Sequence, residues 1–322
     1  MNENIKQRLN KFGKEKEPFL FILSYDLQKA YIEKLSSTKI KYRFHDKNRL
    51  SNIDKNRVFE LKKYPQSFQE YKNKFDILKQ NLDKNIISLA NLTSQTRIDL
   101  NCTLDEVFEN SNALLNLRIN TKDENFVCFS PEKFIEIIDN KLFTYPMKGT
   151  IKADIIDAKK KLLNSKKEIE EHKTVVELLK NDLELENSFS NIVLEEFRYI
   201  DKISTKNGDL LQTSSKISAS CKDNYIENIG DIFSKILPAG SITGMPKNIS
   251  KEILDDIEDY DRGFYCGIFA IFDGKNLQSF VLIRFIEEIN GEFFYKSGGG
   301  ITKNSDEKQE YEELIEKIYL PF

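Results

Sequence analysis

The order of helix-like and strand-like segments is the feature that most restricts how this chain of 322 residues can fold. Three short segments rich in β-forming residues follow one another at 126–130, 133–138 and 141–147. Pro131-Glu132 and Asp139-Asn140 separate them, which is typical of antiparallel hairpins. The charged segment 157–183 has no Pro or Gly and repeats apolar residues three and four positions apart, so it predicts one long helix. Hairpins and helices alternate without βαβ regularity, so the sequence predicts an α+β fold with antiparallel sheets flanked by helices.

Further segments extend this pattern toward both ends of the chain. The apolar run 19–23 predicts a buried strand, and 67–82 carries apolar residues at helical spacing. Thr103 opens the pattern of a capping box, so a helix should begin there. Pro246 suits the first position of another helix, which we expect to end near Tyr260. Three strand-like runs and an acidic helix complete the chain at 264–272, 277–289, 292–298 and 305–320.

Composition restricts the class of function. The chain is 39% hydrophobic, and its 49 basic and 52 acidic residues leave a net charge of -3, with lysines scattered among acidic residues. This balance argues against a nucleic-acid partner. No apolar run approaches the roughly 20 residues that span a bilayer, and the start of the chain lacks the apolar middle of a signal peptide. We therefore expect a cytoplasmic protein without membrane contact, folded as a single domain over residues 1–322.

The side chains available for catalysis are few in kind. The chain has only two histidines, His45 and His172, and no GxSxG motif, so sites built on several imidazoles or on a nucleophile elbow are excluded. Four widely spaced cysteines form no CxxC pair and are interpreted as buried free thiols. Any chemistry must therefore rest on carboxylates, Lys, Arg and backbone amides.

Two glycine loops and several carboxylates remain as candidate sites. Residues 240–247 lack the ending of a P-loop, and 298–303 lack the third glycine of a dinucleotide fingerprint. The run of three glycines can bring backbone amides close to an anion, although a tight turn is an alternative. Glu310 and Glu313 lie three apart on one helix face, and the middle helix offers Glu171, an arrangement that suits Mg²⁺. Without other information, acidic residues such as these are far more often solvated charges than metal ligands.

Eight motifs in collinear order resemble the signatures of the chorismate-binding enzyme family, which includes anthranilate, aminodeoxychorismate, isochorismate and salicylate synthases. They are SPEKF from Ser130, YPMKGT from Tyr145, ELLKNDL from Glu177, GSITGMPK from Gly240, RGFYCG from Arg262, LIR from Leu282, GGGIT from Gly298 and SDEKQEYEE from Ser305. The resemblance covers residues 91–322, the expected catalytic core, while residues 1–90 match weakly. It implies the antiparallel fold of anthranilate synthase component I.

The residue type at the position of Lys148 differs between members of this family. The position typically carries Lys in aminodeoxychorismate synthases and Ala in anthranilate synthases, so the resemblance implies an aminodeoxychorismate synthase component I in the route to 4-aminobenzoate and folate. In the implied mechanism, the Lys148 amine attacks ring carbon 2 of chorismate, the 4-hydroxyl leaves, and ammonia then enters at carbon 4. Anthranilate, isochorismate or salicylate formation, or a relative that only binds chorismate, remain alternatives.

The resemblance also assigns roles to other residues. Glu132 matches the general acid, Glu171 and Glu313 match Mg²⁺ ligands, and Glu310 is a second ligand or an orienting partner. The substrate-binding positions are Thr243, Gly244, Lys247, Tyr265, Arg284, Gly298, Gly299 and Gly300. A glutamine amidotransferase subunit is expected to supply ammonia, because the chain has no glutaminase residues of its own. Gln212 stands where relatives carry a His.

Overall fold

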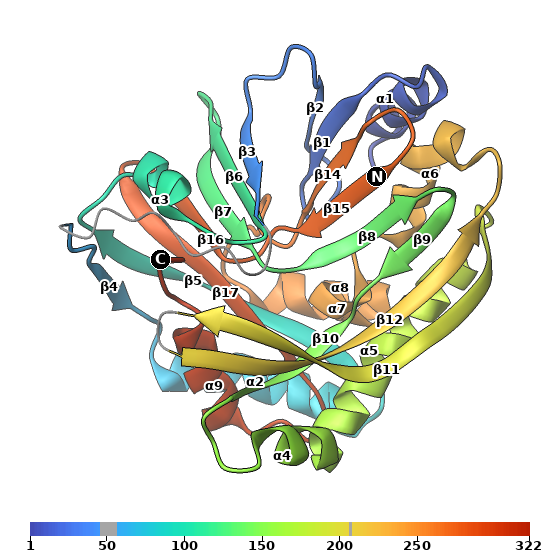
Figure 1. Ribbon diagram of the computed structural model, residues 1–322. Coiled ribbons are helices and arrows are strands. Elements are labelled where there is room, and N and C mark those ends of the chain that lie inside the picture. Colours follow the sequence, from blue (N-terminus) through green and yellow to red (C-terminus); the bar gives the residue numbers. More distant parts are fainter. Residues whose placement is uncertain (46–56, 206–207) are drawn as a thin grey trace. The chain divides into compact units, whose positions relative to one another are not determined.

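The computed structural model describes residues 1–45, 57–205 and 208–322, which form two compact units. The first unit consists of Met1–Thr38, Lys133–Ser241 and Gly267–Val281, and the second of Lys39–Glu132, Ile242–Cys266 and Leu282–Phe322. Each unit contains one antiparallel sheet with helices packed on it (Figure 1), which confirms the predicted α+β class. The assignment of a single domain to residues 1–322 stays a prediction.

In the described part of the first unit, nine strands form a sheet in the order β10-β12-β9-β8-β15-β14-β1-β2, and β11 pairs with the other side of β12. Their bounds are β1 Phe19–Leu23, β2 Ala30–Lys34, β8 Lys133–Ile138, β9 Lys141–Thr144, β10 Met147–Lys152, β11 Phe189–Thr205, β12 Gly208–Cys221, β14 Ile268–Phe272 and β15 Leu277–Val281. All five residues of β1 are buried, so the predicted buried strand is confirmed.

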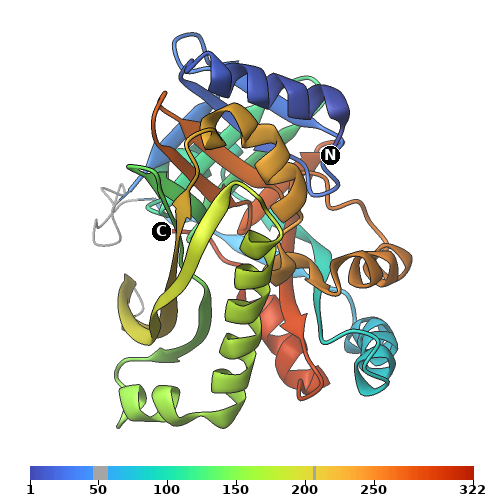
Figure 2. The same cartoon turned by 90° about the vertical axis from the view of Figure 1, so that its right-hand side faces the viewer.

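The helices of this unit are α1 Glu3–Lys14, α4 Ala158–Asn164, α5 Lys166–Glu184 and α6 Ile229–Ile236, with a 3₁₀ turn at Tyr225–Asn228. The prediction of one helix over 157–183 is wrong, because the backbone is extended at Ser165 and two helices result. The Ser165 hydroxyl accepts a hydrogen bond from the amide of Glu168, so it caps α5. In Figure 2 the two yellow-green helices run in different directions on either side of this break.

In the described part of the second unit, the sheet has the order β13-β5-β17-β16-β7-β6-β3, and β4 pairs with β5. The strand bounds are β3 Lys41–Phe44, β4 Leu61–Tyr64, β5 Leu89–Leu100, β6 Leu115–Asn120, β7 Asn125–Ser130, β13 Gly244–Met245, β16 Phe285–Ile289 and β17 Glu292–Ile301. The helices are α2 Phe68–Asp83, α3 Leu104–Asn110, α8 Lys247–Ile257 and α9 Glu307–Glu316. Ser67 and Thr103 begin α2 and α3 with capping boxes, the second as predicted.

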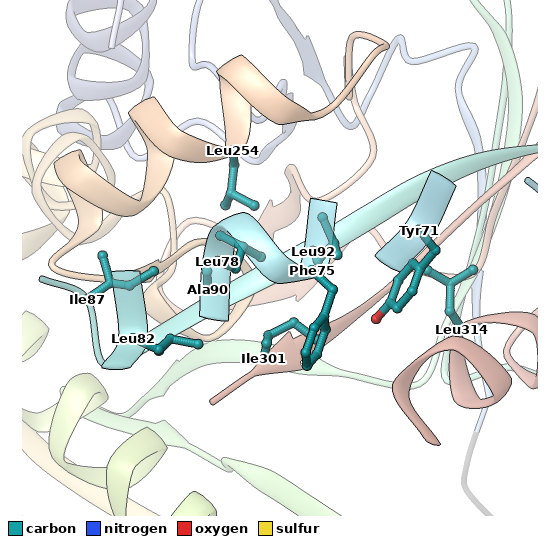
Figure 3. Packing of buried hydrophobic residues seen from close by; sticks show 10 residues of the cluster. All are labelled: Tyr71, Phe75, Leu78, Leu82, Ile87, Ala90, Leu92, Leu254, Ile301 and Leu314. Atoms are coloured by element: carbon teal, nitrogen blue, oxygen red, sulfur yellow. The ribbon is translucent and has the colours of Figure 1, made fainter. Parts of the chain in front are cut away.

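A hydrophobic cluster supports β5 and β17 from the side on which α2, α8 and α9 lie (Figure 3). Its buried members are Tyr71, Phe75, Leu78, Leu82, Ile87, Ala90, Leu92, Leu254, Ile301 and Leu314. Burying a side chain of this size contributes about 1.5–3 kcal/mol. Ile301 follows the three glycines directly in β17 and is a member of this cluster, so the cluster holds the glycine-bearing strand in place.

Two strand predictions need correction. The segments 126–130 and 133–138 do not form one hairpin: β7 pairs with β6 and β16, whereas β8 pairs with β9 and β15. The run 277–289 is not one strand, because the backbone turns left-handed at Arg284 (φ 58°) and divides β15 from β16. The turn at Asp139-Asn140 is confirmed, with both residues at positive φ.

The remaining boundary differences are smaller. The helix that follows Pro246 runs from Lys247 to Ile257 and so ends before Tyr260. Cys102, Cys128 and Cys266 are buried free thiols as expected, and Cys221 is half-buried. Among the residues that the structure describes, no helix has both the length and the apolar character needed to cross a membrane.

Candidate active site

The glycine run lies in the second unit, inside β17. Gly298, Gly299 and Gly300 pair with Thr93, Leu92 and Asn91 of β5, so the alternative of a tight turn is wrong. A Cβ added to Gly298 would lie 2.6 Å from Thr93 Cγ2 and 2.8 Å from the carbonyl oxygen of Leu92. Glycine at this position therefore permits the close approach of the two strands.

The polar groups of Gly298 point away from β5. The amide of Thr93, its partner, donates to Glu258 Oε1 at 2.8 Å instead of to β17, and the carbonyl of Gly298 accepts from Lys317 Nζ at 2.8 Å. Because strand residues two apart direct their N–H and C=O groups to the same edge, Gly300 shares this orientation. β16 covers that edge only as far as Lys296. Two backbone amides are thus directed to a part of the edge past the end of β16, where an anion can bind.

Arg284 stands at the start of β16, beside this edge. Its carbonyl accepts the amide of Phe129 at 3.0 Å, and its Nε donates to the Tyr319 hydroxyl at 3.2 Å. The guanidinium carbon lies 5.6 Å from the centre of the Tyr319 ring, in cation–π contact. The carbonyl contact holds the backbone of Arg284 and the two contacts with Tyr319 restrict its side chain, which favours a fixed orientation of the planar fork toward a carboxylate.

Tyr265 and Glu132 belong to the same neighbourhood. Tyr265 is buried, and burial raises the pKa of its phenol well above the ordinary value while the charges of Arg262 and Arg284 oppose the rise. Burial also raises the pKa of the adjacent Cys266 to about 11, and the carboxylate of Glu132 adds to this rise. Glu132 is half-buried and its amide donates to Ser130 Oγ. The second unit thus brings together the predicted acid, the tyrosine and the arginine.

The carboxylates of α9 decide whether this unit can hold Mg²⁺. Glu310 is buried, and its Oε2 lies 3.4 Å from the position of a Cβ on Gly299. Lys317 Nζ is 2.7 Å from Glu313 Oε1 and also bonds the Gly298 carbonyl, so a cation occupies the space between a carboxylate and a carbonyl oxygen. Such oxygens are the ligands that Mg²⁺ prefers.

The charges of Glu310 and Glu313 act on a neighbouring side chain, Tyr71. After burial, the charges of Glu310 and Glu313 are the main cause that raises the pKa of Tyr71. No group of three or more His, Cys, Asp or Glu side chains within the described residues forms a closed metal cluster. Glu310 and Glu313 therefore supply only part of a donor set, and water or substrate oxygens would have to complete the coordination of Mg²⁺. Lys317 was not singled out in the sequence, although its spacing of four from Glu313 on a helix was a usable signal.

The Thr243 to Lys247 segment brings a buried hydroxyl into the second unit. It follows α7, Gly240–Thr243, and passes through β13 to the first turn of α8, where Lys247 is half-buried. Thr243 is fully buried and its Oγ1 has no hydrogen-bond partner among the described residues. Gly244 has φ 139°, and an added Cβ would lie 2.3 Å from the Leu89 carbonyl oxygen. Glycine is therefore required here, while Thr243 offers an unused polar contact.

In the first unit, Lys148 lies on β10, at an edge of the sheet. It is half-buried and pairs with Thr213 of β12, whose hydroxyl donates to the Lys148 carbonyl. The pairing register shifts between Lys148 and Thr150 because Gly149 has φ 77°. A bulge of this kind redirects neighbouring side chains.

Glu171 lies on α5 in the same unit and is half-buried. The next residue, His172, is fully buried, and its Nε2 lies 2.7 Å from Ser215 Oγ. Burial, followed by the charge of Arg198, lowers the pKa of His172 to about 4, so the ring is neutral near pH 7. Sequence reasoning noted this histidine without giving it a role; Gln212, at the expected histidine position, pairs with Thr150 and Asp201 in the sheet.

Sequence comparisons relate the chain to several groups of proteins. A model of the chorismate binding enzyme family matches residues 20–321. The chain is 42% identical to an uncharacterized PabA-like protein of Haemophilus influenzae, over 98% of its own length and 95% of that protein. It is 30% identical to aminodeoxychorismate synthase component 1 of Bacillus subtilis, over 62% of this chain and 43% of that protein.

Solved structures share the architecture. The menaquinone-specific isochorismate synthase MenF of Escherichia coli superposes with a TM-score of 0.71 at 13% identity, covering 97% of this chain and 80% of that one. Anthranilate synthase component I of Streptococcus pneumoniae gives a TM-score of 0.68 at 17% identity, covering 81% and 58%. At these identities the similarity establishes the fold, and it confirms the predicted one.

Proposed function

Because the chain belongs to the chorismate-binding enzyme family, we propose that it adds an amino group to chorismate and forms aminodeoxychorismate. The observation that carries the proposal is Lys148, which stands in the Pro-Met-Lys-Gly-Thr motif on a bulged strand at a sheet edge. A primary amine at this position supplies a nucleophile that the alanine of anthranilate synthases does not. The similarity to a protein named aminodeoxychorismate synthase component 1 supports the same reaction.

Chorismate carries two carboxylates, and the second unit offers two kinds of anion contact. In the proposal, the enolpyruvyl carboxylate binds Arg284, Tyr265 and the outward amides of Gly298 and Gly300. In the same proposal, the remaining substrate contacts come from Thr243, Gly244, Lys247 and Gly299. Glu310 and Glu313 would hold Mg²⁺, which would neutralise the ring carboxylate, and the resemblance assigns the role of metal ligand to Glu171 as well.

The first chemical step joins the protein and the substrate. The neutral amine of Lys148 forms a bond to ring carbon 2, the two ring double bonds each move by one position, and the bond from carbon 4 to its oxygen breaks. Glu132 donates the proton with which this oxygen leaves as water, so its carboxyl group must be protonated beforehand. The positive charge on the new ammonium is lost when it releases a proton.

The second step releases Lys148 from the substrate as a free amine. Ammonia forms a bond to carbon 4, the double bonds move back, and the bond between carbon 2 and the Lys148 nitrogen breaks as that nitrogen regains a proton. The sum is chorismate plus ammonia giving aminodeoxychorismate plus water, with the enolpyruvyl group retained. We propose that a glutamine amidotransferase subunit delivers the ammonia and that a separate lyase completes 4-aminobenzoate, a folate precursor.

Product analysis tests the proposal. Purified protein is incubated with chorismate, MgCl₂ and ammonium at alkaline pH, and the products are resolved by mass spectrometry. We expect aminodeoxychorismate from the wild type and from Lys152→Ala, an exposed lysine of the same strand, and a loss of roughly 10³-fold or more in Lys148→Ala. Anthranilate, isochorismate or unchanged chorismate from the wild type would overturn it; chorismate binding without turnover would indicate a relative that only binds.

A further inference from the structure

A buried ion pair of the second unit joins the end of α8 to the loop that follows it. Arg262 Nη2 lies 2.7 Å from Glu258 Oε1, and Arg262 Nε donates to Oε2 at 2.7 Å. The two side chains are only 3% and 5% exposed. Two hydrogen bonds between a guanidinium and a carboxylate hold both groups in one relative orientation. The pair therefore fixes the direction in which the other N–H groups of Arg262 point.

Hydrophobic packing sets the position of the helix that carries Glu258. Leu254, one turn earlier on α8, lies in the same cluster as Leu92 of β5 (Figure 3). The amide of Glu258 donates to the Leu254 carbonyl at 2.8 Å, where the helix ends. The carboxylate of Glu258 accepts the amide and the hydroxyl of Thr93, each at 2.8 Å. It is therefore attached to the strand that pairs with the glycine run.

Arg262 and Glu258 lie along a part of the β5 edge that has no strand beside it in the described part of the chain. On this edge β13 pairs with the beginning of β5, and β4 pairs with its end. Between them, the Asn91 carbonyl accepts Arg262 Nη2 at 2.7 Å, and Glu258 accepts the Thr93 amide. A neighbouring strand would form hydrogen bonds with the same backbone groups. The two side chains thus take the place of a strand, opposite the edge on which β17 pairs.

The guanidinium of Arg262 also reaches the segment that carries Thr243. Its Nη1 donates to the carbonyl of Ile242 at 2.9 Å, and this carbonyl belongs to the peptide bond that Ile242 shares with Thr243. The Asn91 carbonyl, which the same guanidinium bonds, belongs to the β5 residue that pairs with Gly300. One side chain thus sets the distance between the Thr243 segment and the strand beside the glycine run.

The backbone of Arg262 holds a third segment, which carries Tyr265. The carbonyl of Arg262 accepts the amide of Tyr265 at 3.0 Å and Lys296 Nζ at 3.1 Å. Lys296 belongs to β17, is 2% exposed and forms an ion pair with Glu287. The loop is therefore bound to β17 through Lys296 and to β5 through the guanidinium of Arg262.

We propose that Arg262 is a positioning residue for chorismate binding: it holds Thr243, the strand beside the glycine run and Tyr265 in the arrangement that receives the substrate. This inference rests on the proposed function, because it takes these segments as the binding surface for chorismate. Arg262 acts through backbone groups of the second unit, whereas the proposed nucleophile Lys148 belongs to the first. Its replacement should therefore weaken chorismate binding more than it lowers kcat.

Equilibrium binding of chorismate in the presence of MgCl₂ tests the inference. Arg262→Lys keeps a positive charge beside Glu258 but loses the planar fork that reaches the carbonyls of Ile242 and Asn91. We expect the dissociation constant for chorismate to rise about tenfold or more, while kcat changes by less than about threefold. An unchanged dissociation constant in folded Arg262→Lys would overturn the inference.

Arg118→Lys is the matched control for a loss of stability alone. Arg118 is a buried arginine of the same unit that donates to the Phe126 carbonyl at 3.2 Å and to Asp105 Oδ2 at 3.1 Å. These partners lie outside the three binding segments. Chemical denaturation should show a similar loss of stability in Arg118→Lys and Arg262→Lys, with chorismate binding of Arg118→Lys within about twofold of the wild type. An equal rise of the dissociation constant in both variants would also overturn the inference.

A double variant keeps the test available if Arg262→Lys does not fold. Arg262→Met combined with Glu258→Gln leaves no buried charge without its partner, and the Gln oxygen can still accept the Thr93 amide. The contacts with the carbonyls of Ile242 and Asn91 are lost, so the same rise in the dissociation constant is expected. Binding equal to that of the wild type would contradict the positioning role.

The outcomes separate this inference from the proposed function. A wild type that forms aminodeoxychorismate, together with equal dissociation constants in wild type and Arg262→Lys, would overturn the role of Arg262 alone. A wild type that binds chorismate but forms another product would overturn the proposed reaction, while the binding comparison would still decide the role of Arg262. A wild type that binds no chorismate would overturn both.

Discussion

The two units place their candidate functional groups by opposite means. In the second unit, Gly298 and Gly300 present backbone amides at a strand edge, and the absence of side chains lets β17 approach β5 closely. In the first unit, Lys148 lies on an edge strand, and the buried hydroxyl of Thr213 donates to its carbonyl. The region around the glycines therefore depends on the close packing of two strands, and the region around Lys148 depends on a hydrogen bond to its backbone. Substitutions in the two regions should have different effects.

Gly298→Val should have the largest effect on the second unit. The new side chain meets Thr93 and the Leu92 carbonyl, so we expect the free energy of unfolding to fall by about 3 kcal/mol and chorismate binding to be lost. Gly299→Ala is the control, because its Cβ would only approach the ends of two flexible side chains, at 3.4 and 3.7 Å. Chemical denaturation measures the free energy of unfolding of both variants. Equal stability of Gly298→Val and wild type would break the packing half of the comparison.

Glu310→Gln sharpens the distinction between packing and charge. The amide keeps the shape of a buried carboxylate but loses its charge, so the Mg²⁺ concentration for half-maximal activity should rise about 10–100-fold. Glu312→Gln, an exposed change on the same helix, should leave this concentration unaltered. The measurement is the activity of both variants over a range of Mg²⁺ concentrations. Equal half-maximal Mg²⁺ concentrations for Glu310→Gln and Glu312→Gln would remove Glu310 from the proposed site.

Arg284→Lys tests the geometry of the anion contact. The lysine keeps the charge but loses the planar fork and the contact with Tyr319, so the KM for chorismate should rise about tenfold or more while kcat changes less. Lys296 is already committed to Glu287 and two carbonyls and cannot replace it. Initial-rate measurements over a range of chorismate concentrations decide, and an unchanged KM would place the carboxylate elsewhere.

Thr243→Val should have the smallest effect. Its buried hydroxyl has no partner in the described structure, so replacing it with a methyl group should leave stability equal or raise it by up to about 1 kcal/mol. If the hydroxyl contacts chorismate as proposed, KM should rise a few-fold over the same change. Ser279→Ala, which removes a hydroxyl bonded to Ile135, should instead lower stability. A stability loss in Thr243→Val would show that its hydroxyl is satisfied in solution.

The sequence was most informative where a single local pattern determines the structure. The apolar run of β1 and the capping box at Thr103 rest on local physics, and both were predicted correctly. Failures came from long-range pairing: β7 and β8 are consecutive and β-rich, yet they join different sheets. The break at Arg284 was missed because its left-handed backbone is imposed by the surrounding structure and not by a glycine or proline.

The candidate site divides in the same way. Lys148, Glu132, Arg284 and the glycine run came from motif resemblance, and the structure brings Glu132, Tyr265, Arg284 and the glycines together within the second unit. Lys317 was missed although its spacing of four from Glu313 was a usable signal, since its contact with the Gly298 carbonyl is not marked by any sequence pattern. Side chains that act through other residues require coordinates to be found.

The central claim is that Lys148 becomes covalently attached to chorismate during turnover. The most direct measurement is a rapid acid quench of the protein with chorismate and MgCl₂, before and after ammonium is added, followed by peptide mass spectrometry. The account predicts that the peptide containing Lys148 gains the mass of chorismate minus water and loses it when ammonium is added and aminodeoxychorismate appears. Aminodeoxychorismate forming while Lys148 stays unmodified throughout the quench series would contradict it.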